Sequence, residues 1–287
     1  MSEVEVVTPE LLRSWALPGA ESSKDRRGQV VVIGGAAGTP GGVALAGLAS
    51  LRVGAGKVQL AVASSVAPAL AAQFPEAGVR GLPETSSGSI AGAEAAERCT
   101  ELCARADTVL IGPGLDDGEE AQRLLEGLLP SLPEHCALVL DAFALGVLNE
   151  VAGHLDKHEA AVVLTPNHRE LEMLLDRSTD ADPEEVLEAA RRFDAAVTVD
   201  ATIADGGGAV WRVPAGHSGL ATAGSGDVLA GLVAGLLARG ATRDQAACWG
   251  TYLHSTAGER LASAVGGLGF LARELVDQVP AILAELT

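Results

Sequence analysis

The sequence predicts an α/β fold in which a mostly parallel sheet lies between layers of helices. Short runs of Val, Ile and Leu alternate along the chain with amphipathic stretches of helical period, which is typical of βαβ units. Hydrophobic residues make up 48% of the 287 residues, so a large core can form without disulfides or metal clips. Aromatic residues make up only 3%, and the 35 glycines let backbone approach backbone or ligand closely.

Buried strands are expected where an apolar, β-branched run stops at Gly, Pro or Asp. These runs cover residues 30–33, 58–62, 108–111, 138–140 and 161–164. Three short stretches punctuated by Gly then break the alternation with helices, which predicts an antiparallel edge of the sheet. They cover residues 197–199, 202–204 and 209–213.

Helices are expected where apolar residues recur with a period of about 3.6 residues. They cover residues 9–15, 43–53, 66–73, 91–104, 119–129, 183–193, 227–238, 243–264 and 269–277, and one more starts near residue 167. Residues 80–90 are rich in Gly, Ser, Pro and Glu and predict an exposed loop. Because no shift in composition marks a linker, we expect a polar lead-in at residues 1–23 and a single domain at residues 24–287.

The charge of the chain narrows the classes of partner. Asp and Glu outnumber Lys and Arg by 38 to 20, which gives a formal net charge of -18. A surface this negative repels phosphodiester backbones and anionic lipids, so we expect neither a nucleic acid nor a membrane as partner. The acidic N-terminus has no apolar signal segment, and the 4 cysteines form no C-x-x-C pair. The sequence therefore predicts a cytoplasmic protein with reduced, buried thiols.

The strongest candidate site is the segment Gly224-Ser225-Gly226-Asp227, at the start of a long apolar helix. Glycines let backbone N–H groups point at a ligand, and the N-terminus of a helix carries about half a positive charge. An aspartate at this place could take a proton from a hydroxyl while the amides stabilise a transferring phosphoryl group. The simpler interpretation is an ordinary Asp N-cap after a Gly-rich turn.

A second candidate is Asn167-His168-Arg169-Glu170, which follows a predicted strand. The spacing of Asn167 and Glu170 matches a capping box, in which each side chain accepts a hydrogen bond from the other residue's amide. The same two polar groups, at the carboxyl end of a strand, are also suited to holding hydrated Mg²⁺ near phosphates. Both interpretations stay open, and Asn167 and Glu170 are candidate metal-binding residues that would act through water.

These two motifs, in this order on an α/β chain, resemble those of the ribokinase-like superfamily, whose fold is a three-layer α/β/α sandwich. Further motifs resemble more narrowly the ADP/ATP-dependent NAD(P)H-hydrate dehydratases, and the match covers roughly residues 24–285. They are VVIGG at 31–35, TPGG at 39–42, LAGLASLRVGAGK at 45–57, FPE at 74–76, IGPGL at 111–115, LDA at 140–142 and LTP at 164–166. The epimerase domain often fused to these enzymes has no counterpart in this sequence.

The resemblance implies a repair enzyme that restores NADH or NADPH after hydration of the nicotinamide ring. The S epimer of the hydrate would be dehydrated with ADP or ATP as co-substrate and Mg²⁺ as cofactor. Phosphorylation of the ring hydroxyl would be followed by elimination of phosphate. Asp227 would activate the hydroxyl, and the anion hole would consist of Gly224, Ser225 and Gly226.

The resemblance also assigns residues to the two ligands and implies a homo-oligomer such as a tetramer. Against the hydrated dinucleotide it places Gly42, Gly114, Asp227 and Asn167 or His168. Against the nucleotide it places Ala201, Thr202, Thr222 and Gly226.

The chain departs from the pattern of this family at two places. Many members carry T-P-H-x-G-E, whereas residues 165–170 read TPNHRE, so the histidine contact is either replaced by Asn167 or displaced. Many members also carry a Lys-Gly pair on the strand that precedes the nucleotide contact. The matching stretch here, residues 197–202, contains no lysine. Two alternatives therefore stay open, namely a small-molecule kinase of the same superfamily and a non-catalytic, nucleotide-binding relative.

Overall fold

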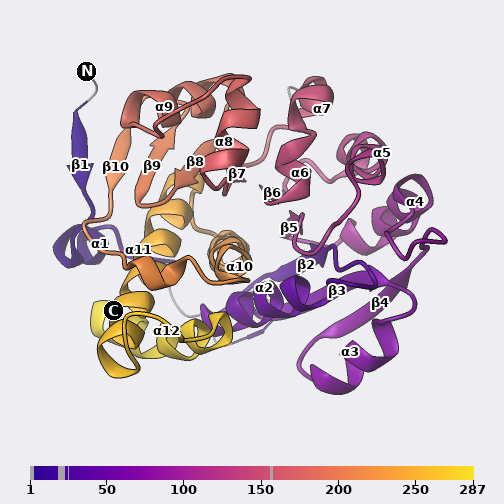
Figure 1. Ribbon diagram of the computed structural model, residues 1–287, viewed down its shortest axis with the longest axis horizontal. Coiled ribbons are helices and arrows are strands. Elements are labelled where there is room, and N and C mark those ends of the chain that lie inside the picture. The colour runs from indigo at the N-terminus through magenta and orange to yellow at the C-terminus, as the bar shows by residue number, and fades with distance from the viewer. Residues whose placement is uncertain (1–2, 19–22, 25, 156–157) are drawn as a thin grey trace.

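The computed structural model describes residues 3–18, 23–24, 26–155 and 158–287. In this part of the chain, helices cover both faces of one ten-stranded sheet (Figure 1). The strands are β1 (Val4–Val6), β2 (Gln29–Ile33), β3 (Lys57–Ala63), β4 (Gly78–Leu82), β5 (Thr108–Ile111), β6 (Ala137–Leu140), β7 (Val162–Leu164), β8 (Ala196–Val199), β9 (Thr202–Asp205) and β10 (Val210–Arg212).

The strand order is β1-β10-β9-β8-β7-β6-β5-β2-β3-β4. The strands from β8 to β4 in this order pair in parallel, whereas β9 pairs antiparallel with both β8 and β10. The predictions of a mostly parallel sheet and of an antiparallel edge are therefore confirmed. Because the parallel strands end at the same edge, the loops after β2, β5, β6 and β7 open on one side of the molecule.

Two layers of helices enclose the sheet (Figure 1). Side chains alternate along β2, so Val30 and Val32 pack into one apolar core and Val31 and Ile33 into the other. The first core contains side chains of α2 (Gly41–Arg52), α3 (Ala67–Gln73), α10 (Ser225–Ala238), α11 (Arg243–Ala264) and α12 (Ala272–Leu286). The second contains side chains of α4 (Gly92–Cys103), α5 (Gly118–Leu128), α6 (Phe143–Gly146), α7 (Leu148–Leu155), α8 (His168–Leu175) and α9 (Pro183–Arg192).

Helices α2 and α10 meet along a seam of small residues, which we define as Ala46, Ser50, Gly231 and Gly235. A Cβ atom on Gly231 would lie 2.2 Å from the Ala46 carbonyl oxygen, and one on Gly235 would lie 2.7 Å from the Ser50 carbonyl oxygen. The Ser50 hydroxyl is 2.9 Å from the Ala46 carbonyl oxygen and 2.8 Å from that of Gly231. Residue numbers increase together on both helices, so α2 and α10 run parallel with their N-termini side by side.

The N-terminal segment contributes more to the fold than a lead-in would. The helix expected at 9–15 is present as α1 (Pro9–Ser14), but the strand β1 was not predicted. Val4 of β1 pairs with Val210 of β10, and the ring of Trp15 stacks on that of Trp211 with 6.1 Å between centroids. Residues 1–2 and 19–22 of the expected lead-in lie outside the described part of the chain.

Four further elements differ from the sequence-based expectation. Residues 80–90 were expected to be a loop, but β4 extends to Leu82 at the edge of the sheet, where its two glycines hide the strand pattern. Helices α6 and α7 are short and were not predicted. Helix α12 was expected to end at 277, yet it continues through Pro280 to Leu286 because Val279 and Ile282 are buried in the core.

Candidate active site

The loops that follow the parallel strands lie side by side at the carboxyl edge of the sheet. The N–H of Asp141 donates to the carbonyl of Ile111 (3.0 Å), and the N–H of Thr165 donates to that of Leu140 (3.2 Å). A Cβ atom on Gly112 would lie 1.8 Å from the Asp141 carbonyl oxygen, so only glycine permits this approach. Hydrogen bonds between neighbouring strands therefore hold the residues that follow β5, β6 and β7 close together.

Gly224 lies at the N-cap position of α10 and shapes the turn that leads into it. Its φ of 88° is in the left-handed region, which favours glycine. A Cβ atom here would also lie 2.5 Å from the Leu45 side chain. No side chain caps this helix start, so its first amides depend on backbone, water or a ligand for acceptors.

The amides of this turn have different partners. The N–H of Ser225 donates to the Thr222 carbonyl at 3.1 Å, and the Ser225 hydroxyl lies 2.8 Å from Nε2 of His254. Within the described residues, the N–H groups of Gly226 and Asp227 have no hydrogen-bond acceptor. Gly226 is exposed and Asp227 half-buried, so both amides are available to an anion.

The carboxylate of Asp227 lies against the first turn of α2. A Cβ atom on Gly42 would be 2.7 Å from Oδ1 of Asp227, so a side chain at Gly42 would displace this carboxylate. Pro40, the N-cap of α2, makes no side-chain cap either. Two uncapped helix N-termini therefore converge on one carboxylate. Burial, and next the negative charge of Glu170, raise the pKa of Asp227 to about 6.

Asp141 lies close to Asp227 and Glu170, although its sequence context indicated only the end of a strand. It is buried, and Oδ1 accepts a hydrogen bond from the Thr165 hydroxyl at 2.8 Å. Burial raises its pKa to about 8, with further contributions from the charges of Asp227 and Glu170. Three carboxylates from separate strand ends and helix starts therefore share one electrostatic environment.

Asn167 and Glu170 form the capping box that their spacing predicted. Oδ1 of Asn167 accepts from the Glu170 amide at 3.0 Å, and Oε2 of Glu170 accepts from the Asn167 amide at 2.9 Å. Glu170 is half-buried and its pKa is raised, mainly by burial. His168, the first residue of α8, is exposed. The cap thus confirms the structural interpretation and holds the Glu170 carboxylate near Asp141 and Asp227.

The fold itself requires glycine at position 114, apart from any contact with a ligand. Its φ is 69°, and a Cβ atom would lie 2.2 Å from the Thr39 carbonyl oxygen. Of the residues expected at the nucleotide, Thr222 and Gly226 belong to the turn that leads into α10, whereas Ala201 and Thr202 lie on the same edge in the turn after β8. There Ala201 is half-buried and its carbonyl accepts from the N–H of Val213 (2.8 Å), whereas Thr202 is buried as the first residue of β9.

The donor set is suited to a hydrated divalent cation. Among the described residues, no three side chains of His, Cys, Asp or Glu converge as a ready-made metal cage. However, Mg²⁺ is commonly held by one or two carboxylates together with water and substrate phosphates. Asp141 and Glu170 offer two such carboxylates. Burial, and next the negative charges of Asp227 and Glu170, disfavour the ionised form of Asp141, and a bound cation would favour it.

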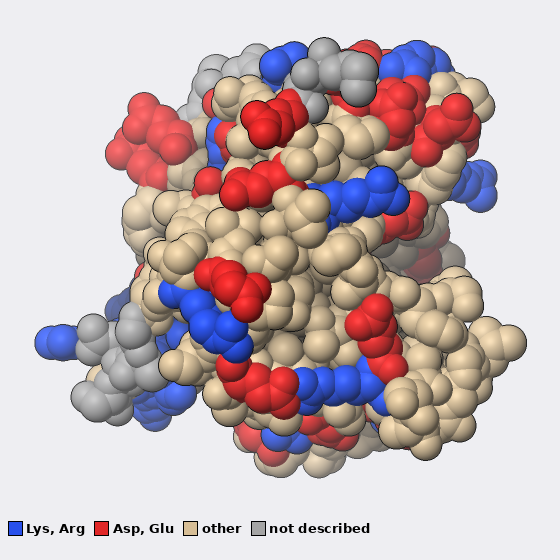
Figure 2. Space-filling model, turned by 90° about the vertical axis from the view of Figure 1, so that its left-hand side faces the viewer, with Lys and Arg blue, Asp and Glu red and all other residues tan. Residues whose placement is uncertain are grey.

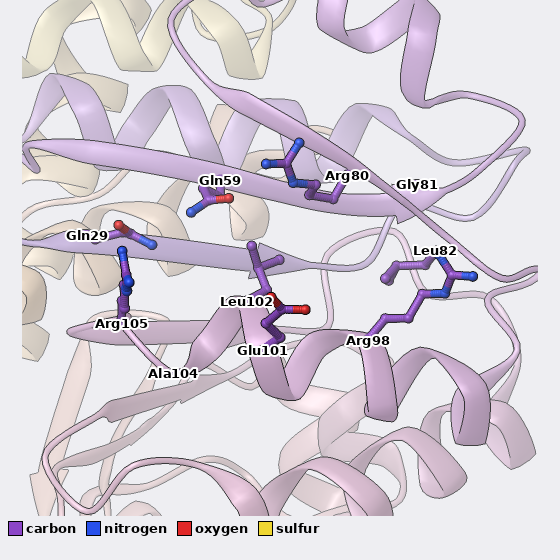
Figure 3. Close-up of a pocket in the computed structure, with 10 residues that line it drawn as sticks. All are labelled: Gln29, Gln59, Arg80, Gly81, Leu82, Arg98, Glu101, Leu102, Ala104 and Arg105. Atoms are coloured by element: carbon purple, nitrogen blue, oxygen red, sulfur yellow. The ribbon is translucent and has the colours of Figure 1, made fainter.

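A cavity of about 730 Å³ lies away from these residues, beside β2, β3, β4 and α4 (Figure 3). Arg80, Arg98 and Arg105 line it, together with Gln29 and Gln59. Figure 3 shows the three guanidinium groups spread along the cavity rather than directed at a common centre. It contains none of the carboxylates described above.

On the face shown in Figure 2, described side chains of both charges are scattered among uncharged ones, without a continuous basic area. No helix in the described part of the chain is long and apolar enough to cross a membrane. Cys99, Cys103, Cys136 and Cys248 are all buried free thiols, as expected.

Comparison with known sequences identifies relatives along the whole chain. A family model described as NAD(P)H-hydrate dehydratase matches residues 30–281. The chain is 41% identical to an ADP-dependent (S)-NAD(P)H-hydrate dehydratase of Xanthomonas campestris, over 99% of this chain and 97% of that protein. It is 36% identical to a bifunctional NAD(P)H-hydrate repair enzyme of Moorella thermoacetica, covering 96% of this chain and 54% of that protein. The chain thus spans about half the length of this bifunctional relative.

Solved structures show the same fold. An ADP/ATP-dependent NAD(P)H-hydrate dehydratase of Bacillus subtilis, co-crystallised with ATP and Mg²⁺, superimposes with a TM-score of 0.82 at 26% identity. The match covers 99% of each chain. A ribokinase-like superfamily protein of Enterococcus faecalis also gives a TM-score of 0.82, at 25% identity, over 99% of this chain and 96% of the other. The expected ribokinase-like sandwich is confirmed.

Proposed function

The chain belongs to the NAD(P)H-hydrate dehydratase family, and we propose that Asp227 starts its reaction, the ADP- or ATP-dependent dehydration of the S epimer of hydrated NADH or NADPH. One observation carries this assignment. The Asp227 carboxylate lies where two uncapped helix N-termini meet, beside amides that have no acceptor in the described part of the chain.

The first step is a proton transfer to Asp227. Its pKa of about 6 leaves the carboxylate ionised at neutral pH, yet basic enough to take the proton of a ring hydroxyl as that oxygen attacks phosphorus. The hydroxyl O–H bond breaks, an O–P bond to the terminal phosphoryl group forms, and the nucleotide leaves one phosphate shorter. The ring hydroxyl, which is a poor leaving group, is thereby converted into a phosphate ester, which is a good one.

The amides of the α10 turn stabilise the negative charge on the transferring group. Both hydrogen-bonding groups of Ser225 have protein partners. In the expected anion hole we therefore replace Ser225 by Asp227, so that the N–H groups of Gly224, Gly226 and Asp227 form it. The α10 dipole adds to their effect. Loss of phosphate, together with a proton from the neighbouring ring carbon, then restores the double bond of the nicotinamide ring.

The substrate residues follow from their positions. We propose that the hydrated ring lies over Gly42, where the missing side chain leaves room beside Asp227, and that the loop of Gly114 lies along the dinucleotide. Exposed Asn167 or His168 supplies a further contact. For the nucleotide we propose Ala201, Thr202 through its backbone, Thr222 and Gly226.

Mg²⁺ is the proposed cofactor, held by Asp141 and Glu170 directly or through water, with Asn167 orienting Glu170. When bound, the ion supplies positive charge to the phosphates of the nucleotide. We also propose a cytoplasmic location and a homo-oligomer such as a tetramer. The exposed apolar side chains of Val265, Leu268 and Leu271 offer an interface for it, and light scattering would test the oligomeric state.

The test is a direct assay in which hydrated NADH or NADPH is incubated with the protein, Mg²⁺ and either ADP or ATP. Recovery of the absorbance of the reduced nicotinamide ring is the expected result. A small-molecule kinase would instead consume nucleotide only with its own alcohol present, and a non-catalytic relative would bind nucleotide in calorimetry without turnover. No recovery with either nucleotide would reject the assignment.

A further inference from the structure

We propose that His254 is a positioning residue for this reaction. Through a hydrogen bond to Ser225, it fixes the first turn of α10 and so sets the direction of the Asp227 carboxylate and of the adjacent amides. This inference rests on the proposed function of that turn, and it assigns a role to a residue on a different helix.

The contact joins two helices inside the core. His254 lies on α11 and Ser225 is the first residue of α10, and Nε2 and Oγ are 2.8 Å apart. His254 is 8% exposed and Ser225 is 4% exposed. A hydrogen bond so shielded from water is not weakened by competition with solvent, so it restrains both partners.

The turn has little other side-chain support. Gly224 and Gly226 flank Ser225, and glycine is the residue with the most backbone freedom. No atom lies within 4 Å of the place a Cβ on Gly226 would take, and no side chain caps the helix. Among the described residues, the Ser225 hydroxyl makes the one side-chain hydrogen bond that joins the Gly224–Asp227 turn to another element.

His254 holds this turn as a neutral group. Burial lowers its pKa to about 4, opposed by a backbone hydrogen bond at Ser225. A neutral imidazole offers one donor and one acceptor nitrogen, which suits a serine hydroxyl and adds no positive charge beside Asp227. The histidine therefore restrains the turn and leaves proton transfer to Asp227.

The test compares His254→Leu, His254→Gln and Ser225→Ala with a matched control, Thr251→Val. Thr251 lies one turn earlier on α11, is buried, and forms a hydrogen bond of the same length, 2.8 Å, to the Thr198 hydroxyl. We expect His254→Leu and Ser225→Ala each to lower kcat by about tenfold to a hundredfold, because small misplacements of reacting groups are costly. His254→Gln should restore most of the rate, and Thr251→Val should stay within about threefold of the parent.

Two readouts separate positioning from a general loss of stability. The double variant of His254→Leu and Ser225→Ala should be no slower than the slower single variant. Hydrogen exchange of the two hydrogen-bonded amides of this turn, those of Ser225 and Val228, should rise in both single variants but not in Thr251→Val. Equal losses of kcat in Thr251→Val and His254→Leu, or unchanged exchange at this turn, would overturn the proposal. Should His254→Leu not fold, Ser225→Ala carries the same comparison. The exchange readout needs no substrate, so it stands even if the hydrate assay rejects the proposed function.

Discussion

Helices α8 and α10 both begin at the active edge of the sheet, and their N-termini differ in how their amides are satisfied. At α8, Asn167 and Glu170 satisfy each other's amides in a capping box. At α10, Gly224 offers no cap, and within the described residues the amides of Gly226 and Asp227 have no acceptor. The first start needs no ligand, whereas the second leaves two amides open to one.

The difference separates a structural role from a chemical one in two similar motifs. A capped N-terminus fixes a carboxylate, here Glu170, at a defined place. An uncapped N-terminus keeps its partial positive charge for an anion. We therefore expect changes at α10 to affect rate most and changes at α8 to affect mainly stability.

The largest effect is expected from Asp227→Asn, which keeps the shape of the side chain and removes the base. kcat should fall by about 10² to 10⁴. In the parent, kcat/KM should decline as the pH falls below about 6, the pKa of Asp227, and the variant should lose this dependence. The pKa of Asp227 is higher in the folded than in the unfolded protein. The free energy of unfolding therefore decreases as the pH rises from 3.8 to about 6. The variant should therefore have a higher Tm at pH 7, and an unchanged rate would reject the role of Asp227.

The next largest effect is expected from Gly42→Ala. The added methyl group would meet Oδ1 of Asp227 at 2.7 Å and push the carboxylate from the convergence of α2 and α10. We expect kcat to fall by about tenfold to a hundredfold with little change in Tm. The matched control is Gly41→Ala, because a Cβ at Gly41 meets no atom within 4 Å. Equal activity of the two variants would show that the Gly42 contact is unimportant.

The variant Asp141→Asn should distinguish the role of a metal ligand from the role of Asp227, which takes the proton. The folded pKa of Asp141 is raised to about 8, so the parent loses stability as pH rises from 3.8 to about 8. The asparagine variant keeps an acceptor for the Thr165 hydroxyl without this cost. In urea unfolding, the free energy of unfolding of the variant should exceed that of the parent by more at pH 9 than at pH 5. This difference between variant and parent should grow by about 1 to 5 kcal/mol between the two pH values. The kcat of the variant should respond weakly to Mg²⁺, and a normal Mg²⁺ response would exclude Asp141 as a ligand.

The smallest effect on rate is expected from Asn167→Ala, which removes one half of the α8 cap. Stability should fall by about 1 kcal/mol, and kcat by less than about tenfold, through a looser Glu170. Asp182→Ala on α9 is the matched control, because it breaks another capping box on a helix without site residues. A comparable loss of stability in both variants, with kcat reduced only in Asn167→Ala, would confirm that the first cap serves the site.

The sequence predicted what is encoded locally. Apolar runs marked the inner strands such as β5, and the residues 224–227 marked the uncapped start of α10. Strand β1 escaped prediction because its three residues are specified by pairing with β10, far along the chain. For the same reason Asp141 received no role: its pKa is raised by burial and next by the charges of residues 227 and 170, and only the fold brings these about.

The partners of Ser225 were hidden in the same way. Its place in the motif suggested an anion-hole residue, whereas its hydroxyl is directed to His254 on the following helix. Nothing in the spacing of 225 and 254 predicts this contact, because it depends on how α10 and α11 pack. Side-chain direction at a helix start is thus a tertiary property, and sequence motifs alone assign it poorly.

The seam between α2 and α10 adds positions, outside the crevice, at which an inherited substitution would impair this enzyme. Gly231 and Gly235 lie one and two turns beyond Asp227, and a methyl group on Gly231 would meet backbone at 2.2 Å. Such a change would spread the two helices and separate their starting points without touching any ligand. Natural variants with intact crevice residues but impaired repair should therefore be sought along this seam.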